Sequence, residues 1–456
     1  MRIAIDPTTP EGYQTFIRCK QLPAYRVEGR EVVTDQMSYE SVFGKPDKSD
    51  LICSSARLFD YQQAVCNTAL QKRRYAAFLD CGLGKTAIFL HWADQVAVTG
   101  KVLILCPLSV IAEVTSEAVK FNISAPVHNL REGYDTWTSG IGVLNYEQCR
   151  DIPMRGVKGV ILDESSILKN GDGKTKKWLT ALVANVPYRL ACSATPAPNE
   201  QSEYASHAVF LGISRTNKEF YSRFFRKQGN DWLLKAHATK AFYRSLASWS
   251  CYIHDPRKAG YEAGGYLDEE PEYILRRCAP VVETGNNTLF HASLGLSQAR
   301  EIFRARANPD TGRFRFVVET AISYRSVVWC KYNDEEAAFA AAIPNSAVVT
   351  GKTPIEQRVG IIDRWRSGEI NTIISKPSIL GWGVNMQQAE AHVYSGYDFS
   401  FESFYQAIRR SHRYGRKGRL KVFIPVTPSE QGIFATIERK LSRFRHDVAE
   451  LQNMYS

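Results

Sequence analysis

The chain has 456 residues, of which 44% are hydrophobic and 23% are charged, and its formal net charge is +11. A chain of this length exceeds one ordinary hydrophobic core, so we expect about two or three domains. No segment approaches the roughly 18 consecutive apolar residues of a membrane-spanning helix. The N-terminus also lacks the basic and apolar regions of a secretory signal. We therefore expect a cytoplasmic protein with no membrane partner.

The positive charge and the cysteines bear on the kind of ligand. An excess of Lys and Arg favours a polyanionic partner, although many basic proteins bind none. The ten cysteines include no Cys-x-x-Cys pair, and several lie in apolar runs such as 102–106. This pattern predicts reduced, mostly buried thiols and no zinc site.

Two stretches of the chain alternate apolar strands with amphipathic helices, which is typical of parallel α/β sheets. The first spans about residues 57–212, with expected strands at 75–80, 101–106, 141–146, 159–163 and 188–194. The second spans about residues 296–456, with expected strands at 326–330, 346–350, 371–376, 391–397 and 421–426. We predict two α/β lobes, with a small N-terminal segment at 1–56 and an irregular, partly helical insert at 213–295.

The insert contains the sequence KEFYSRFFRK, in which aromatic and basic residues interleave. Such a segment suits a wedge that faces nucleic acid. It also suits a helix that buries Phe220, Phe224 and Phe225 in a hydrophobic core, and aromatic burial favours this second interpretation.

A phosphate-binding loop is predicted where an apolar strand is followed by residues 81–86, CGLGKT, and then by a helix. Backbone N–H groups around Gly82, Leu83 and Gly84 and the helix N-terminus would face the phosphates, which Lys85 also reaches. The glycines let the backbone approach without a Cβ in the way, and Thr86 would hold Mg²⁺. The full consensus also requires a glycine where this chain has Leu79.

Two carboxylates, Asp163 and Glu164, follow the buried strand predicted at 159–163. Asp163 would hold Mg²⁺, and Glu164 would orient and polarise the attacking water. The alternative is an acidic cap on the next turn, which explains one carboxylate better than two. Upstream, the amide of Gln62 can both donate and accept, so it could read an adenine edge, although an exposed helix glutamine is the commoner explanation.

A basic run from Arg409 to Lys421 contains seven Arg or Lys residues and no acidic residue. Arg410 and Arg413 are three residues apart and would share one helix face. There they could reach the γ-phosphate as arginine fingers from the opposite lobe. The alternative is a solvated basic face or a patch that contacts a phosphate backbone.

The order of these motifs resembles that of the superfamily 2 helicases and translocases, and most closely the Swi/Snf-type group, which includes compact phage and bacterial forms. Residues 58–62 resemble the adenine-reading Q motif, and residues 80–86 resemble motif I. Residues 143–147 resemble the family's Asn-Tyr-Glu segment. Residues 163–170 resemble motif II, with Ser166 in place of the usual histidine.

The remaining motifs concern coupling and nucleic-acid binding. Residues 107–109 resemble motif Ia, residues 193–196 motif III, residues 375–387 motif V and residues 406–415 motif VI. The resemblance implies coupling roles for Ser193, Ala194, Thr195, Gly383 and Gln406. It also implies nucleic-acid contacts for Pro107, Ser109, Asn385 and a loop that contains Lys352 and Thr353.

Motif VI has a second possible register. Residues 412–419 also match the DEAD-box spelling, which would make Arg416 and Arg419 the arginine fingers. We prefer Arg410 and Arg413, because Gln406 and Ala407 match the Swi/Snf-type register. Motif II also lacks the DEAD-box spelling.

The resemblance implies two RecA-like lobes around a cleft, with ATP and Mg²⁺ as cofactors. We expect a DNA-stimulated ATPase that translocates along duplex or branched DNA and remodels it. Alternatives are a strand-separating helicase, an RNA-stimulated helicase, a motor subunit of a restriction or defence complex, or a nucleotide-gated binding module. Intact Lys85, Glu164 and both arginines argue against the last. We expect a monomer in a bacterial or phage-infected cell, with a nuclease or a replication or recombination protein as a candidate partner.

Overall fold

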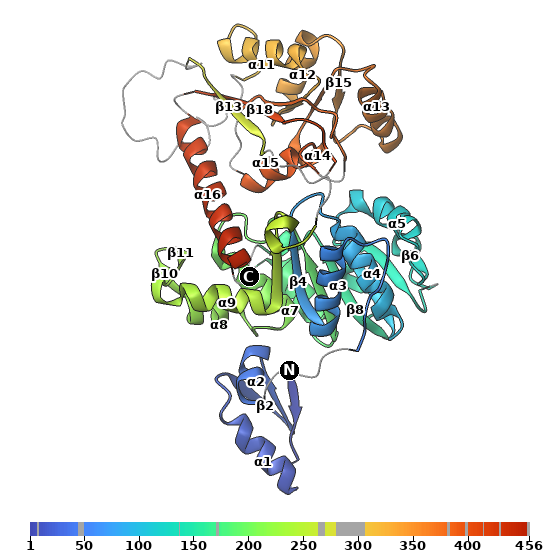
Figure 1. Ribbon diagram of the computed structural model, residues 1–456, viewed down its shortest axis with the longest axis vertical. Helices are drawn as coiled ribbons and strands as arrows, with labels where there is room; N and C mark the ends of the chain where they lie inside the picture. The colour runs from blue at the N-terminus through green and yellow to red at the C-terminus, as the bar shows by residue number, and fades with distance from the viewer. Residues whose placement is uncertain are drawn as a thin grey trace. The chain divides into compact units, whose positions relative to one another are not determined.

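The computed structural model describes residues 1–6, 9–43, 50–135, 137–169, 173–262, 270–279, 306–380, 384–396, 400–413, 415–427 and 430–453. The chain divides into two compact units. Lobe 1 consists of Met1–Ala263 together with His446–Ser456, and lobe 2 consists of Gly264–Arg445 (Figure 1). Each lobe is built around its own parallel sheet, which confirms the predicted α/β fold class.

The sheet of lobe 1 has seven strands, and every neighbouring pair is parallel. Its strands are near-continuous apolar runs because a parallel sheet between helices is buried on both faces. Residues 102–106, for example, are all fully buried. The spatial order is β12 (Ser250–Ile253), β4 (Arg74–Leu79), β9 (Tyr188–Cys192), β8 (Val157–Asp163), β5 (Lys101–Cys106), β7 (Ile141–Asn145) and β6 (Val127–Asn129).

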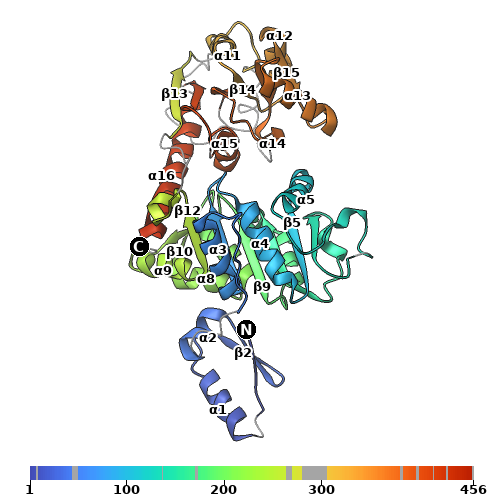
Figure 2. The same ribbon diagram turned by 45° about the vertical axis from the view of Figure 1, so that its right-hand side comes forward.

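Helices cover this sheet, and α3 and α4 lie side by side against it (Figure 2). The α-helices of lobe 1 are α3 (Asp60–Lys72), α4 (Lys85–Ala97), α5 (Ile111–Lys120), α6 (Lys174–Leu182), α7 (Tyr204–Leu211), α8 (Asn217–Phe224) and α9 (Thr239–Trp249). Short 3₁₀ turns are η1 (Leu108–Val110), η2 (Leu130–Glu132), η3 (Cys149–Asp151), η4 (Ser165–Lys169), η5 (Gln201–Glu203), η6 (Ala236–Ala238) and η7 (Pro256–Ala259). The last turns of α16 (Gln431–Asn453) also belong to lobe 1, where Asp447 accepts hydrogen bonds from Tyr243 and Gln201.

The segment that the sequence analysis assigned to an insert contributes to both sheets. Its helix α8 buries Phe220 and Phe224, and Phe225 begins a hairpin of β10 (Phe225–Gln228) and β11 (Asp231–Leu234). All three rings contact Phe242 of α9, which confirms the hydrophobic interpretation of KEFYSRFFRK. Further along, β12 is an edge strand of the lobe 1 sheet, and β13 (Glu272–Arg277) is an edge strand of the lobe 2 sheet.

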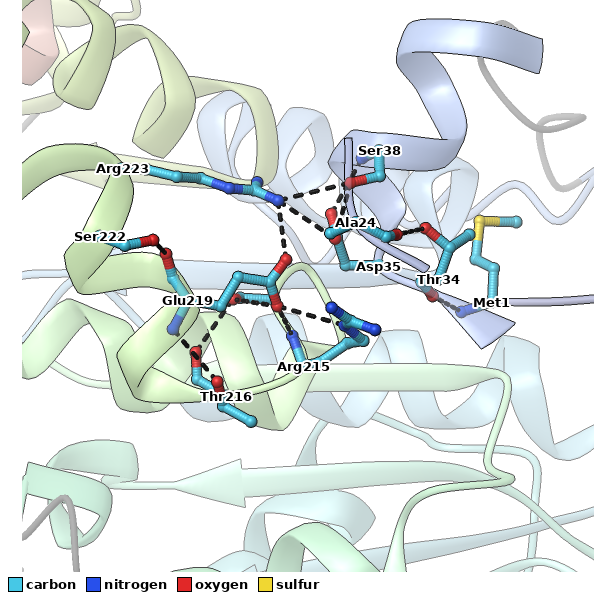
Figure 3. A network of polar contacts seen from close by, with 11 residues as sticks. Met1, Ala24, Thr34, Asp35, Ser38, Arg215, Thr216, Glu219, Ser222 and Arg223 are labelled. Carbon is cyan, nitrogen blue, oxygen red and sulfur yellow. Dashed lines mark hydrogen bonds and ion pairs between the residues drawn. The ribbon is translucent and has the colours of Figure 1, made fainter. Parts of the chain in front are cut away.

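The N-terminal segment forms a small antiparallel sheet in the order β1 (Arg2–Ala4), β3 (Glu31–Thr34), β2 (Tyr25–Glu28), with α1 (Pro10–Cys19) and α2 (Gln36–Phe43). Its contact with α8 is polar (Figure 3). The guanidinium of Arg223 lies 3.1 Å from the buried Asp35 carboxylate and 2.8 Å from Glu219 of its own helix. Asp35 in turn accepts a hydrogen bond from Ser38. A buried carboxylate is costly unless it is paired, so this contact anchors the segment to lobe 1.

The lobe 2 sheet has six strands, and every neighbouring pair is again parallel. Its spatial order is β13, β18 (Lys421–Val426), β17 (Ala391–Tyr394), β14 (Ser326–Trp329), β16 (Thr372–Ser375) and β15 (Ser346–Val349). Its helices are α11 (Gly312–Ser323), α12 (Asn333–Ala342), α13 (Ile355–Ser367), α14 (Pro377–Leu380), α15 (Phe401–Ile408) and most of α16. Phe314 of α11 and Phe339 of α12 stack in its hydrophobic core.

A buried ion cluster joins the start of α11 to the end of β18. Arg306, Arg313 and Glu430 are each at most 1% exposed. The Glu430 carboxylate accepts hydrogen bonds from Arg306 at 2.6 Å and from both terminal nitrogens of Arg313. Burial alone would raise the pKa of Glu430, but hydrogen bonds and charge from Arg313 and Arg306 lower it to about 2.

Removing the charge of Glu430 is expected to destabilise lobe 2. Glu430→Gln leaves two buried guanidinium groups without their anion, which costs about 3–5 kcal/mol of unfolding free energy. Hydrogen exchange of β14 and β18, followed by mass spectrometry, would measure this loss. Glu369→Gln is the matched control, because the Glu369–Arg364 pair is more than half exposed and should contribute less than about 1 kcal/mol. Equal exchange in the two variants would contradict the prediction.

The same cluster sets the direction of the pH dependence. The folded pKa of Glu430, about 2, lies below its ordinary value of 4.5. The stabilisation by its carboxylate is therefore complete above about pH 4.5 and is lost as the pH falls toward 2. Glu430→Gln should flatten this part of the stability profile.

Two other observations bear on the sequence predictions. All ten cysteines lie in the described part of the chain; none of them forms a disulfide, and eight are buried. Among the described residues, no helix combines the length and the apolar character that crossing a bilayer requires.

Candidate functional site

The phosphate loop lies at the carboxyl end of β4, between that strand and α4. Gly82 and Gly84 have φ values of +84° and +73°, which side chains with a Cβ rarely adopt. A Cβ on Gly84 would also lie 2.2 Å from the Gln62 side chain. Leu79, which replaces the first consensus glycine, is the last residue of β4 and is fully buried. The two remaining glycines therefore suffice for the left-handed turns of this loop.

Lys85 begins α4 and turns its side chain back along the loop. Its ammonium donates hydrogen bonds to the carbonyls of Leu79 at 3.0 Å and Asp80 at 3.2 Å. Both acceptors are neutral, so an anionic phosphate would compete well for the same ammonium. The arrangement places a cation beside the backbone N–H groups of the loop, which is the chemistry of an anion site.

Gln62 and Tyr61 of α3 hold the loop from the side. The Gln62 amide nitrogen and the Tyr61 hydroxyl each donate to the Leu83 carbonyl at 3.0 Å. The Gln62 amide oxygen accepts from the Phe59 N–H at 3.0 Å. Gln62 is also buried, so it is not the exposed helix glutamine of the alternative interpretation. In this conformation its side chain helps to position the phosphate loop.

The motif II carboxylates follow β8, next to the strand that precedes motif III. Asp163 ends β8, and its carbonyl accepts from the Tyr146 hydroxyl at 2.6 Å. Glu164 has a φ of +60°, an uncommon conformation for a residue with a side chain. Its carboxylate accepts from the Ser193 hydroxyl at 2.6 Å, and Ser193 also accepts from the Thr195 N–H at 3.0 Å. A direct hydrogen bond therefore connects motif II to motif III.

The electrostatics of this pair favour a cation. Burial and the charge of Glu164, partly opposed by Lys85, raise the pKa of Asp163 to about 7. A divalent cation would relieve the same repulsion. Carboxylate and hydroxyl oxygens are the ligands that Mg²⁺ prefers, and it commonly takes one or two of them beside substrate phosphates. The donors Asp163 and Thr86 therefore fit Mg²⁺.

Ala194, the second residue of motif III, is bonded to β12. Its carbonyl accepts from the Tyr252 hydroxyl of β12 at 3.0 Å. Ala194 and Thr195 are buried, so neither side chain is presented to solvent in the described conformation. The three motif III residues are thus fixed between β8 and β12.

In lobe 2, motifs V and VI contact each other. The Arg410 carbonyl accepts from the Met386 N–H at 2.9 Å, and the Arg410 guanidinium donates to the buried Gln406 amide at 3.2 Å. Gln406 lies on α15, and Arg410 and Arg413 follow that helix as half-buried side chains. Gly383 lies outside the described residues.

The competing arginines of motif VI have different surroundings. Arg416 is 7% exposed, and its guanidinium donates to the carbonyls of Gly418 and Gln387 at 2.9 Å each. Burial lowers the pKa of Arg416 to about 10. Arg419 is exposed and donates to the Glu270 carbonyl at 3.0 Å. Arg416 therefore holds the chain between motifs V and VI, whereas Arg410 and Arg413 are half-buried residues after α15.

The residues expected to contact nucleic acid lie in two loops and one turn. Ser109 is an exposed residue of η1 beside Pro107. Lys352 is exposed, while the Thr353 hydroxyl accepts from the Thr350 N–H at 3.0 Å and closes its own turn. Asn385 is half-buried, with its side chain bonded to Gln387 and its carbonyl to Arg366. Ser109 and Lys352 are therefore the side chains most open to a phosphate backbone.

Sequence reasoning missed several residues around the lobe 1 site. Tyr146 and Tyr252 hold the backbone of Asp163 and Ala194, and His254 contacts Asp80 beside the phosphate loop. Only Tyr146 lay within a recognised motif, the Asn-Tyr-Glu segment. Tyr252 lies in β12 and His254 follows it, and the place of this short strand in the sheet gives no local signal in the sequence.

Comparisons with known proteins match both lobes. The DEAD/DEAH box helicase family matches residues 59–203, and the helicase conserved C-terminal domain matches residues 297–415. Among solved structures, the chain is similar to the SWI2/SNF2 ATPase core of Sulfolobus solfataricus, solved in complex with dsDNA. That match has 16% sequence identity and a TM-score of 0.43, and it covers 89% of this chain and 96% of that one. No functionally curated protein matches the sequence.

Proposed function

Because the chain belongs to the superfamily 2 helicases and is an ATPase of that class, we propose that it is a DNA-stimulated translocase that moves along duplex or branched DNA and remodels it. The observation that carries the proposal is the joining of motif II to motif III, through the Glu164–Ser193 hydrogen bond at 2.6 Å. A motor needs such a link, because a change at the nucleotide must alter the elements that follow it in the sheet.

The roles of the lobe 1 residues follow from their positions. The loop N–H groups of Gly82, Leu83 and Gly84 and the Lys85 ammonium bind the phosphates of ATP. Asp163 and Thr86 hold Mg²⁺, which when bound neutralises charge on the phosphates. Glu164 accepts a proton from the attacking water and keeps it oriented.

Motif VI supplies the catalytic residues of lobe 2. Arg410 and Arg413 stabilise the charge that develops on the γ-phosphate, while Gln406 orients Arg410. Gly383, Ala194 and Thr195 belong to the segments that transmit the nucleotide state. Hydrolysis that depends on arginines from the second lobe would link ATP turnover to a change between the lobes.

Duplex DNA is proposed as the nucleic acid along which the protein moves, because of the residues found in motifs II and VI. Gln406 and Ala407 match the Swi/Snf-type register, and motif II lacks the DEAD-box spelling. The net charge of +11 suits a phosphate backbone of either kind. Pro107, Ser109, Lys352, Thr353 and Asn385 are proposed to contact that backbone, so binding should weaken steeply with salt.

Two measurements test which nucleic acid stimulates the ATPase and whether the protein translocates or separates strands. ATPase activity is expected to rise with duplex DNA and not with RNA of the same length. The protein is also expected to displace the third strand of a DNA triplex without separating a simple duplex that has a single-stranded tail. The Lys85→Ala variant serves as the control for ATP dependence in both assays.

Each alternative predicts a different outcome. Stimulation by RNA alone would identify an RNA-dependent enzyme, and separation of the tailed duplex would identify a strand-separating helicase. Activity that appears only with an added nuclease or a replication or recombination protein would favour a subunit of a larger defence or repair complex. Sedimentation of the isolated chain tests the expectation that it is a monomer.

A further inference from the structure

The strand β12 lies beside the strand that leads into the phosphate loop. It pairs with β4 in a register that sets Ile253 opposite Leu79. The ladder then continues by one bond, because the Asp80 N–H donates to the Ile253 carbonyl at 2.9 Å. The residue after Ile253 therefore lies beside the residue that opens the loop.

A close ion pair forms at this point. Nδ1 of His254 lies 2.7 Å from Oδ2 of Asp80. Asp80 is 2% exposed, and its other carboxylate oxygen accepts from the Cys81 N–H at 2.7 Å. His254 keeps about a fifth of its side chain exposed, with 22% accessible, so solvent can still reach the imidazole.

The pair has a physical consequence for anion binding. A phosphate site needs positive potential from the loop N–H groups, the helix N-terminus and Lys85. The Asp80 carboxylate lies in the same loop and opposes that potential unless its charge is neutralised. His254, when protonated, neutralises this charge, and its contact with Oδ2 places it beside the carboxylate that holds the Cys81 N–H.

The turn after His254 reaches the same loop a second time. Asp255 caps η7 by accepting from the Arg257 N–H at 3.0 Å, and the Tyr261 N–H donates to the Pro256 carbonyl at 3.1 Å. This fixed turn brings the Tyr261 ring to 6.3 Å from the Tyr61 ring. Tyr61 is the residue whose hydroxyl binds the Leu83 carbonyl. Residues 254–261 therefore contact both the beginning of the loop and the side chain that supports its middle.

We propose that His254 is a positioning residue of the phosphate loop, and that the turn 254–261 clamps the loop in the conformation that binds ATP. The proposal rests on the ATPase function proposed above and adds a residue to it. His254 acts through Asp80 and not on the phosphates themselves.

The test is binding of a fluorescent ATP analogue to the full chain without DNA, together with steady-state ATPase kinetics. His254→Ala should weaken analogue binding and raise the KM for ATP by about tenfold, as expected when a buried carboxylate loses its charged partner. The kcat at saturating ATP should stay within about twofold, because nucleotide-driven closure of the loop restores the reacting geometry. His254→Lys, which keeps a cation near Asp80, should recover most of the affinity.

Two comparisons separate positioning of Asp80 from a nonspecific effect of removing a histidine. His237→Ala removes an exposed histidine of η6, outside the turn 254–261, and should leave analogue binding unchanged. In an Asp80→Asn background there is no carboxylate to neutralise, so adding His254→Ala should change binding by less than about threefold. Thermal unfolding of each variant shows whether it is folded.

Wild-type affinity in His254→Ala would overturn the proposal, as would an equal loss in His237→Ala. An undiminished effect of His254→Ala in the Asp80→Asn background would also overturn it, because the histidine would then act independently of Asp80. These results are distinct from failure of the proposed function. A wild-type protein that binds the analogue but shows no DNA-stimulated turnover would reject the translocase, while the binding comparisons would still test His254.

Discussion

Replacing Arg410 by alanine is expected to lower ATP turnover by about 10³–10⁵-fold, the range associated with arginine fingers. The Arg410 side chain is half-buried and donates to the amide of Gln406, so its removal empties no fully buried position. The variant should therefore fold normally and still bind ATP through the lobe 1 loop. Single-turnover hydrolysis measures the chemical step, and circular dichroism with thermal unfolding measures the fold.

Arg416→Ala is the matched comparison for motif VI. Its guanidinium is buried and donates to the carbonyls of Gln387 and Gly418, so its loss removes two hydrogen bonds of a charged group, at about 1.5–3 kcal/mol each. This variant should unfold at a lower temperature and lose activity only in proportion to the folded fraction. If Arg410→Ala kept its activity and a well-folded Arg416→Ala lost it, the DEAD-box register would be correct.

Glu164→Gln is expected to lower turnover by about 10²–10⁴-fold while ATP binding remains. Glutamine has the same shape and keeps an oxygen that can accept from Ser193, as Glu164 does at 2.6 Å. It cannot take a proton from the attacking water, so the loss should appear in the chemical step alone. A fluorescent ATP analogue measures binding, and rapid-quench hydrolysis measures the chemistry.

Lys85→Ala provides the contrasting variant for this site. Lys85 supplies the only side-chain cation of the predicted phosphate loop, so its removal should weaken analogue binding as well as turnover. If Glu164→Gln also failed to bind the analogue, its role would be structural. Nearly normal hydrolysis in Glu164→Gln would instead show that another group orients the water.

The strands of both sheets could be predicted because their signal is local. Residues 102–106 and 422–426 are uninterrupted apolar runs, each preceded by a lysine, and the strands at 101–106 and 421–426 have the predicted bounds. The strands β12 and β6 were not predicted, since four residues such as SCYI are too short for a period to be read. Their place in the sheet comes from pairing with β4 and β7, which are distant in sequence.

Some residues of the candidate site could likewise be recognised from the sequence, and others could not. Glycines at 82 and 84, followed by Lys85 and Thr86, can be recognised without a structure because the phosphate chemistry needs these types in consecutive positions. The inward-facing amide of Gln62 could not be recognised, because its partner is the Leu83 carbonyl on another element. In motif VI, the sequence offers two registers for the arginine fingers, and only the structure shows that Arg416 is buried.

The sequence by itself determined the fold class, the order of the motifs and the residue types of the nucleotide site, since each depends on spacing within a few residues. Tertiary structure alone decided which polar groups are occupied within the protein. It paired Glu164 with Ser193, Asp80 with His254 and Glu430 with two arginines. The physical reason is that a charge or hydrogen bond acts over a few ångströms in space, whatever the separation along the chain, and only folding brings these partners together.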